Sequence, residues 1–503
     1  MKCGATPSAR LLFAFLLSLA FTFPAYAHIG SKDVFEEVSA GPYKLFVTIR
    51  TPSVIPGVAT VEVRSSGAAI SSMRITPIPL TGEAAKHPPS SDAMQPSATD
   101  PGFFTGSLWL MASGSWQVHF DLDGAGGKLS AGVPVPAMPL SILPMQRSMG
   151  TMLALLGIVL VIGISGIVAA AVGQARTEPG VDPGAKQRRR AVIAGLATLA
   201  ITSLIVYGGY IWWNGEAAAY AADIYHPLSL NPSLQGDTLD LKIGRYDTDE
   251  RRSFRARSNS DLLPDHGHVM HLYAIRQPEM DAVYHLHPAV VSAGDLQIAL
   301  PGVPPGTYRL YADIVHANGF PETLTADLTV PAGLAAAPLA AEDAEGAPPP
   351  LSQGELGTTY KLPDGYTMVW DRPAELSANT AYAFHFRLLD AAGQAAADAR
   401  PYLGMAGHAA FVKTDGTVFA HTHPEGSAAM QAVMLANGST GEMADTGEMG
   451  GMDAATAGPA AAEHIPPVVE FPYGFPSPGR YRIFIQMKHA NTVETGVFDA
   501  DVR

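Results

Sequence analysis

Short runs in which apolar and polar residues alternate recur along the first third and the second half of the chain. They are clearest at 43–50 (YKLFVTIR), 58–64 (VATVEVR) and 115–122 (SWQVHFDL). Because successive side chains of a strand point to opposite faces, such alternation predicts antiparallel strands with one buried face. Turn residues such as Pro56-Gly57 separate the runs. The pattern over 28–147 therefore predicts a small β-sandwich.

Two apolar runs interrupt this pattern, at 148–174 and 191–215, and neither contains a charged residue. Each is longer than the ~20 residues that a helix needs to cross a bilayer. The segment between them, 175–190, is rich in Lys and Arg, which places it in the cytoplasm by the positive-inside rule. Since neither run contains an ionisable residue, the two helices are expected to anchor the chain rather than to form a transport pathway.

The first 27 residues have the pattern of a secretory signal peptide. Lys2 and Arg10 precede a short apolar run, and Ala25-Tyr26-Ala27 is a small-x-small cleavage site. An exported N-terminus and a cytoplasmic basic loop are consistent with the same membrane topology. The chain is expected in the bacterial inner membrane, with both large arms in the periplasm and the short basic loop in the cytoplasm.

The composition excludes several classes of function and of metal site. A net charge of −14 argues against a nucleic-acid partner. The single cysteine, Cys3, lies in the expected signal peptide and excludes a disulfide framework, zinc ribbons, Fe–S ligation and CxxC redox chemistry. The chain has no HExxH, P-loop or nucleotide-binding glycine motif. These absences predict a non-enzymatic protein whose metal chemistry, if any, uses His, Met and carboxylates.

The second arm contains an internal repeat, in 216–330 (repeat A) and 358–503 (repeat B). Repeat A reads GHVMHLYAI, YHLHP and PPGTYRLYADIVHANG, and repeat B reads GHAAFVKT, AHTHP and SPGRYRIFIQMKHAN in the same order. Both are expected to be β-sandwiches. An Ala- and Pro-rich linker, 331–357, separates them. Aligned on these motifs, the histidines pair as His268 with His408, His285 with His421, His287 with His423 and His316 with His489.

These histidines have the spacing of metal ligands. Two residues at i and i+2 of a strand lie on one face, ~6.6 Å apart, so the imidazoles of an HxH pair can converge on one ion. A single histidine in a strand is more often an ordinary polar side chain, but recurrence in one order favours a site. The donor set suits copper above zinc, without excluding zinc. The expected ligands are His268, His285, His287, His316, His408, His421, His423 and His489, in one shared site or two, with His271 a further candidate.

Two other segments are candidates for copper. An insert in repeat B, 430–466, includes GEMADTGEMGGMD, and the thioethers of Met443, Met449 and Met452 would select Cu(I). A low-complexity linker with incidental methionines explains it equally well. Signal cleavage would leave His28 as the N-terminal residue, whose amine and imidazole could chelate Cu(II).

The HLHP and AHTHP blocks, with the strand that follows each, resemble the YtkA-like domain family of exported bacterial proteins. The resemblance covers about 262–330 and 400–500 and implies metal handling, with copper the expected metal.

The sequence as a whole predicts a mainly β protein with three immunoglobulin-like or cupredoxin-like β-sandwich modules and two transmembrane α-helices. The expected function is copper binding for buffering or for delivery to a copper exporter or cupro-enzyme assembly factor. A metal-free interaction module of the envelope and a His-ligated metalloenzyme are the alternatives.

Overall fold

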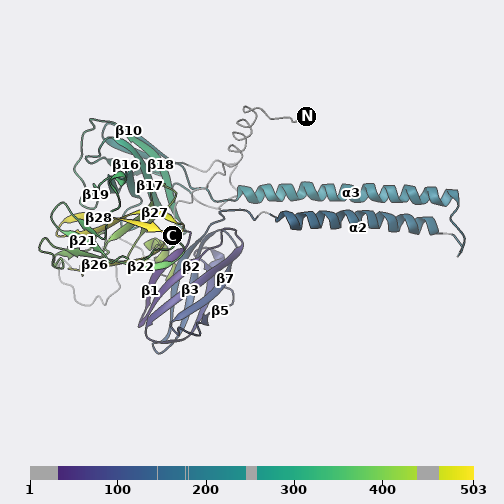
Figure 1. Ribbon diagram of the computed structural model, residues 1–503, viewed down its shortest axis with the longest axis horizontal. Coiled ribbons are helices and arrows are strands. Elements are labelled where there is room, and N and C mark those ends of the chain that lie inside the picture. The colour runs from purple at the N-terminus through teal and green to yellow at the C-terminus, as the bar shows by residue number, and fades with distance from the viewer. Residues whose placement is uncertain (1–31, 144, 176, 179, 245–257, 439–463) are drawn as a thin grey trace, which may run out of the picture.

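The computed structural model describes residues 32–143, 145–175, 177–178, 180–244, 258–438 and 464–503. These residues form six β-sheets in a head from which two long helices project (Figure 1). The prediction of a mainly β chain with two apolar helices is confirmed. The expected signal peptide, His28, and the methionines Met443, Met449 and Met452 lie outside the described residues.

The N-terminal module is a sandwich of two antiparallel sheets. The first has the order β1 (Val34–Ala40), β2 (Tyr43–Arg50), β3 (Gly57–Gly67), β7 (Phe103–Leu110), β6 (Gln95–Pro96). The second has the order β5 (Asp92–Ala93), β4 (Ile70–Pro79), β8 (Gly114–Gly124), β9 (Gly127–Ala137), and the short helix η1 (Glu83–Lys86) follows β4. Alternate residues of each strand, such as Leu45, Val47 and Ile49, fill the core between the sheets.

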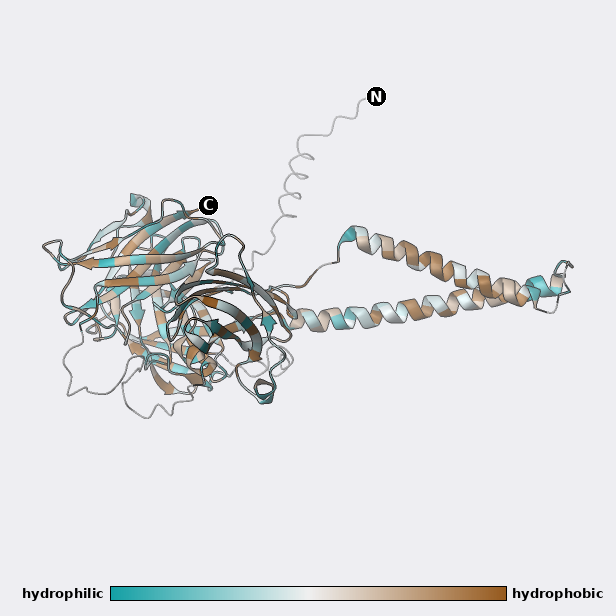
Figure 2. Ribbon diagram, turned by 90° about the horizontal axis from the view of Figure 1, so that it is seen from below, coloured by the Kyte–Doolittle hydropathy of each residue, from teal (hydrophilic) through white to brown (hydrophobic). Residues whose placement is uncertain are grey.

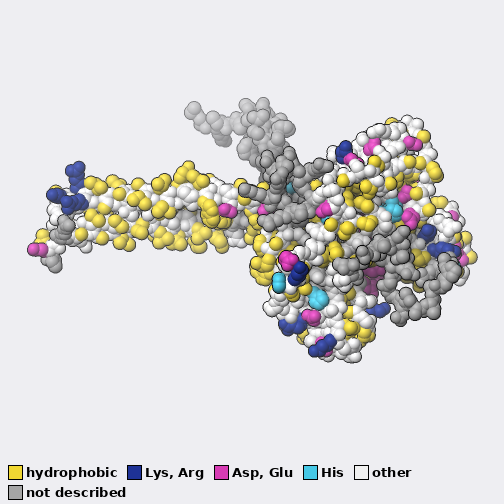
Figure 3. Space-filling view, turned by 180° about the vertical axis from the view of Figure 1, so that it is seen from behind, with side chains coloured by type: hydrophobic (Ala, Val, Ile, Leu, Met, Phe, Trp, Pro, Cys, Tyr) yellow, Lys and Arg dark blue, Asp and Glu magenta, His cyan; other side chains and the backbone are white. Residues whose placement is uncertain are grey.

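The helices α2 (Arg147–Gln174) and α3 (Ala185–Ala222) form an antiparallel hairpin. Both are long and apolar enough to cross a membrane, judged by length and composition. Apolar residues recur along both helices (Figure 2), and apolar side chains cover much of the hairpin's surface (Figure 3). Leu160 and Leu204 are 62% and 70% exposed. The basic residues gather at the tip far from the head (Figure 3).

The second helix is longer than predicted at both ends. It includes residues 185–190, which were expected in the basic loop, and it continues past 215 to Ala222. The added residues are mostly Lys, Arg, Gln, Glu and Ala, which all have high helix propensity. The helix therefore extends beyond the apolar run into charged sequence. The Tyr220 hydroxyl donates to the carbonyl of Ile55 (2.9 Å), which fixes the last turn of α3 to the N-terminal sandwich.

Repeat A is a sandwich of two sheets. One has the order β10 (Leu230–Gln235), β11 (Thr238–Ile243), β16 (Asp295–Ala299), β15 (Ala289–Ser292). The other has the order β12 (Leu262–Leu263), β17 (Gly306–His316), β13 (His271–Gln277), β14 (Val283–Leu286), β19 (Ala344–Gly346), with β18 (Pro321–Val330) also paired to β17. The strand β19 lies inside the segment expected as a linker, so that segment contributes to the sheet of repeat A.

Repeat B has the same plan. One sheet has the order β20 (Thr359–Lys361), β21 (Thr367–Trp370), β22 (Ala381–Leu389), β26 (Val468–Gly474). The other has the order β23 (Ala399–Arg400), β27 (Gly479–His489), β24 (His408–Lys413), β25 (Phe419–Thr422), with β28 (Thr492–Val502) paired to β27. The helices η3 (Leu351–Gln353) and α4 (Met430–Ala436) complete the described elements, and α4 is the first part of the predicted insert.

The two repeats pack against each other through the sheets that contain β13 and β24. An apolar cluster between these sheets combines residues of both repeats, and the rings of Tyr311 and Phe419 stack within it at 4.3 Å. The guanidinium of Arg482 is fully buried, donates to the carbonyls of Met280 (3.1 Å) and Pro349 (2.9 Å), and pairs with Asp499. This shared interface brings the histidine motifs of both repeats together at one end.

The N-terminal sandwich also contacts repeat B. The carboxylate of Glu36 accepts from the backbone N–H of Ala428 (2.6 Å), and the N–H of Glu37 donates to the carbonyl of Glu425 (2.6 Å). The Asn437 side chain, just after α4, forms two hydrogen bonds with the backbone of Gly132. The three sandwiches therefore form a single head.

Candidate metal centre

The register of the strands corrects one expected pairing of histidines. Tyr308 lies opposite Arg276, and its counterpart Tyr481 lies opposite Lys413. Counting back five residues, His271 of repeat A corresponds to His408 of repeat B. The GH dipeptides that suggested His268 as the partner of His408 occupy different places, because in repeat A the dipeptide lies in a turn before the strand.

That turn differs in chemistry between the repeats. Paired bridges join Asp265 to His268 in repeat A and Tyr402 to Met405 in repeat B, so these turns are equivalent. His266 and Leu403 occupy the same position, and both have φ near 51°. Repeat A therefore carries two histidines, His266 and His268, where repeat B carries Leu403 and Met405.

Eight histidine rings of the described chain form one continuous cluster at the edge of the interface between the repeats. The alternation of each strand explains their convergence, because His271 is on the same face of β13 as the interface residues Tyr273 and Ile275. Neighbouring rings lie 4.1–6.4 Å apart between centroids. The members are His266, His268, His271, His285, His287, His408, His421 and His423.

Three members, His271, His285 and His287, are termed the intra-repeat group because all belong to repeat A. Their ligand atoms lie within 4.8 Å of one another. The Nδ1 of His271 is 3.1 Å from the Nε2 of His285 and 3.2 Å from the Nε2 of His287. Nitrogens bound to one tetrahedral ion at ~2.0–2.1 Å lie ~3.3–3.4 Å apart, so these separations suit a shared ion.

The outer nitrogen of each ring in the intra-repeat group faces an oxygen. The Nε2 of His271 donates to the carbonyl of Asp265 (3.1 Å), the Nδ1 of His285 to the Oε1 of Gln486 (2.7 Å), and the Nδ1 of His287 to the carboxylate of Asp343 (2.9 Å). A neutral imidazole has a single N–H, so these acceptors fix the tautomers. Three buried lone pairs then converge, an arrangement that a cation stabilises and that metal-binding histidines share.

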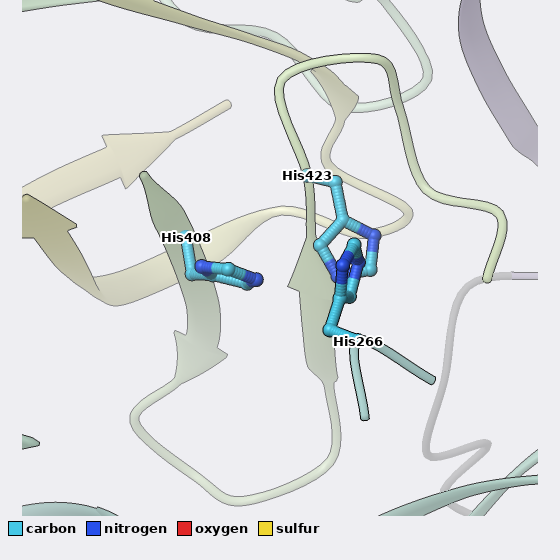
Figure 4. Close-up of side chains that lie close together, drawn as sticks. All are labelled: His266, His408 and His423. Atoms are coloured by element: carbon cyan, nitrogen blue, oxygen red, sulfur yellow. The ribbon is translucent and has the colours of Figure 1, made fainter. Parts of the chain in front are cut away.

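A second set, His266, His408 and His423, is termed the inter-repeat group because it combines one ring of repeat A with two of repeat B. Their ligand atoms also lie within 4.8 Å of one another. Figure 4 shows the three side chains directed toward a common region. The Nε2 of His266, both nitrogens of His408 and the Nε2 of His423 are buried without a hydrogen-bond partner.

Burial keeps these rings neutral near pH 7. It lowers the pKa of His271, His285, His408 and His423 well below the usual value, and neighbouring histidines lower it further. Burial also lowers the pKa of His266 to about 4. Burial lowers the pKa of His287 as well, although Asp343 opposes the shift. Neutral imidazole is the form that binds metal.

Two expected ligands lie outside the cluster. His316 and His489 end β17 and β27 on the opposite face from the cluster, in register with core residues such as Leu310 and Ile483. Both nitrogens of His316 pair with carboxylates, Asp261 and Glu322, each at 2.9 Å. These two histidines therefore do not join the other predicted ligands.

His489 lies in a different group. Its Nε2 is 2.8 Å from Asp364, its Nδ1 is 3.5 Å from Asp398, and Glu494 lies near enough to share an ion with it. Asp261 and Asp398 occupy equivalent positions, since Leu262 and Ala399 lie opposite His316 and His489. An Asp–His–Glu arrangement recurs in both repeats, which indicates a structural role at the end of each long strand.

The supporting carboxylates were missed because they lie in the segment expected as a linker. Asp343 binds His287, and Glu342 accepts from the Nε2 of His268 at 2.9 Å. His268 is the more accessible end of the cluster, with a side chain 23% exposed. The sequence EDAEG was a local signal, since acidic residues interrupt an otherwise Ala- and Pro-rich stretch there.

A pocket reaches the cluster from the side where the helices join the head. Its lining includes His271, His421 and His423 together with Met138 and Tyr225. The last two residues lie just before α2 and just after α3. The histidine centre is therefore accessible near the base of the helical hairpin.

Comparisons with known proteins match part of the chain to a family model and give no activity. A family model described as a domain of unknown function (DUF8832) matches residues 237–332 and 359–503, which correspond to the two repeats. No curated protein matches the chain.

Several solved structures match with low similarity. A bacterial ice-binding adhesin has 7% identity and a TM-score of 0.15, with 92% of this chain and 99% of that chain covered. The alpha-2-macroglobulin of E. coli has 8% identity and a TM-score of 0.20, with 93% of this chain and 23% of that chain covered. A putative membrane anchored protein from Corynebacterium diphtheriae has 9% identity and a TM-score of 0.15, with 94% and 96% covered. Scores this low support no inference about function.

Proposed function

We propose that this protein is a membrane-anchored copper-binding protein of the bacterial periplasm. The observation that carries the proposal is the intra-repeat group, in which three imidazole nitrogens converge while each outer nitrogen donates to an oxygen. Outer hydrogen bonds of this kind orient metal-binding histidines and raise their basicity. The motif resemblance to the YtkA-like family supports the same reading.

Copper is the preferred metal of this proposal. The converging atoms are imidazole nitrogens, and for nitrogen donors the usual order of affinity places Cu(II) above Zn(II). No described cysteine is present to select a softer site. Three histidines with neutral rings could hold Cu(II), Cu(I) or Zn(II). The proposal therefore predicts an order of affinity, with Cu(II) bound more tightly than Zn(II).

The role of the centre is storage or transfer of copper rather than catalysis. The rings are deeply buried, which suits retention of an ion, and the pocket opens near the base of the helices. A copper exporter of the inner membrane or an assembly factor for a copper enzyme could contact the head there. The basic residues at the far tip of the hairpin would lie in the cytoplasm.

The test is metal titration of the full-length protein in detergent after removal of bound metal with a chelator. Cu(II) and Zn(II) are titrated by calorimetry, Cu(I) is titrated under reducing conditions, and metal per chain is measured by mass spectrometry. The double substitution His285→Ala with His287→Ala should weaken copper binding at this group by more than about 100-fold, because loss of an outer hydrogen bond alone costs 10–100-fold.

A matched control removes two histidines outside the cluster. His119 and His385 have side chains 31% and 46% exposed and pair with single surface carboxylates. Their replacement by alanine should leave copper affinity unchanged. Absence of tight binding in the unaltered protein, or equal loss in both double variants, would contradict the proposal and favour a metal-free envelope module.

A further inference from the structure

We propose that the histidine cluster holds two metal ions side by side, one at the intra-repeat group and one at the inter-repeat group. This inference rests on the copper-binding function proposed above. The two groups share no ring, so each supplies three nitrogens of its own. A single ion at either group would leave the three imidazoles of the other group without a metal.

The unpartnered nitrogens of the inter-repeat group are the first argument. His408 is fully buried with neither nitrogen hydrogen-bonded, and the Nε2 atoms of His266 and His423 are buried in the same state. Buried polar atoms are nearly always paired, and exceptions require an explanation such as a bound ion. An ion at the intra-repeat group cannot satisfy these atoms, whereas a second ion among them binds one nitrogen of each of the three rings.

The carboxylates around the cluster are the second argument. Asp343 contacts His287 at 2.9 Å, Asp313 lies 3.3 Å from His421, and Asp265 lies 4.0 Å from His266. Asp265 is 6% exposed, and its Oδ1 has no hydrogen-bond partner. Buried carboxylates require a compensating cation. Asp343 and Asp265 are buried, whereas the Asp313 side chain is 22% exposed. Asp343 contacts a ring of the intra-repeat group and Asp265 lies beside a ring of the inter-repeat group, so each group has a buried carboxylate next to it.

The two groups are also adjacent. The His271 and His408 rings are 6.4 Å apart, and the His285 and His408 rings are 6.1 Å apart. The ring of His421 lies within 5.5 Å of rings from both groups, and its Nε2 is buried without a partner. Two ions held in these groups would be near neighbours, and His421 could complete the ligands of either.

The structure supplies a specific test through the difference between the repeats. The substitution His266→Leu places in repeat A the residue that repeat B carries at the equivalent position, where Leu403 tolerates the same φ of 51°. Full-length protein in detergent is loaded with Cu(II), freed of excess metal, and analysed for copper per chain and for the integrated Cu(II) electron paramagnetic resonance signal. The control is His268→Met, which copies Met405 at a ring that belongs to neither group.

Two copper ions per chain are expected in the unaltered protein and in His268→Met, and one in His266→Leu. The resonance signal should correspond to fewer than two isolated spins in the first two proteins and to one full spin in His266→Leu. One ion per chain in all three proteins would overturn the inference while leaving the proposed function intact. Two ions per chain with a signal of two full spins would show that the ions are not near neighbours and would overturn that part of the inference. Absence of any copper binding would overturn the proposed function itself.

Discussion

The histidine-bearing sheets of repeats A and B have the same order of common strands, to which repeat A adds β19, but the two repeats support their histidines differently. Each has a strand histidine followed by an HxH pair, namely His271 with His285 and His287, and His408 with His421 and His423. In repeat A these three rings converge and all their outer nitrogens face oxygens. In repeat B both nitrogens of His408 are unpartnered, and the third member of its group, His266, comes from repeat A. Duplication preserved the ligand positions, while the surrounding residues diverged.

The residue paired with the strand histidine on the neighbouring strand illustrates this divergence. Asp313 of repeat A and Gln486 of repeat B are equivalent, since they lie opposite His271 and His408. Each crosses the interface to the other repeat: Asp313 lies beside His421, and Gln486 accepts from His285. Each repeat therefore supports a histidine of the other, and the inter-repeat group takes its ligands from both sandwiches. The centre requires the packed pair.

The largest expected effect is that of metal on stability. A ligand that binds only the folded state stabilises it by about 4 kcal/mol at a free concentration a thousandfold above Kd. Copper should therefore raise the free energy of unfolding of the head by about that amount, measured by chemical denaturation of the full chain with and without chelator. The His285→Ala, His287→Ala variant should lose most of this increment, and an unchanged increment would contradict the assignment of those ligands.

The next largest effect is expected from loss of the Asp–His–Glu arrangement, which should lower the free energy of unfolding more in repeat A than in repeat B. His316→Ala should destabilise the protein by about 3 kcal/mol, because Glu322 has a fully buried side chain and would lose a partner. His489→Ala should cost about 1 kcal/mol, because Asp364 and Asp398 are 30% and 37% exposed and remain hydrated. Chemical denaturation measures both, and copper per chain should not change. Equal costs would show that exposure does not explain the difference.

The His316 interaction also predicts a pH dependence of stability. Burial lowers the pKa of His316, but hydrogen bonds to Glu322 and Asp261 outweigh it and raise the pKa above the usual value. A raised folded-state pKa means that the stabilisation is complete below about pH 6.5 and is lost as pH rises through the folded-state value. The difference in unfolding free energy between the unaltered protein and His316→Ala should shrink over that range. If this difference in unfolding free energy grew with pH, it would contradict an interaction of protonated His316 with Glu322 and Asp261.

Removing an outer carboxylate should have a moderate effect on copper. Asp343→Asn deprives the Nδ1 of His287 of its charged acceptor and should weaken copper binding at the intra-repeat group by 10–100-fold. Asp327, which pairs with Arg309 and has a side chain 65% exposed, provides the control, and Asp327→Asn should not change affinity. Calorimetric titration distinguishes the two. Equal affinities would remove the segment around β19 from the site.

The smallest expected effect concerns His268, at the accessible end of the cluster. His268→Met should change the free energy of unfolding by no more than about 0.5 kcal/mol, the range of ordinary surface substitutions. Its effect on copper should lie in the rate of loading, since Glu342 and His268 border solvent. Stopped-flow mixing with Cu(II) measures that rate, and a loss of stoichiometry instead would make His268 a ligand of the centre.

The sequence by itself determined much of the local structure. Alternation located strands such as Tyr43–Arg50, the uncharged runs located both helices, and the repeat identified His285, His287, His421 and His423 as the recurring HxH pairs. Alternation also contained the information that excludes His316 and His489, because each continues the core face of its strand in register with Leu310 and Ile483. These features are local, so the periodicity of one strand or helix is sufficient to define them.

Only the tertiary structure decided which histidines meet. The register of β13 and β24 replaced His268 by His271 as the counterpart of His408, and the packing of two sheets placed His266 beside His408 and His423. Strand β19 brought Asp343 to His287 from a segment whose composition indicated a linker. These contacts join residues more than fifty positions apart, and their geometry depends on how the two sandwiches pack, which no pattern within a single strand specifies.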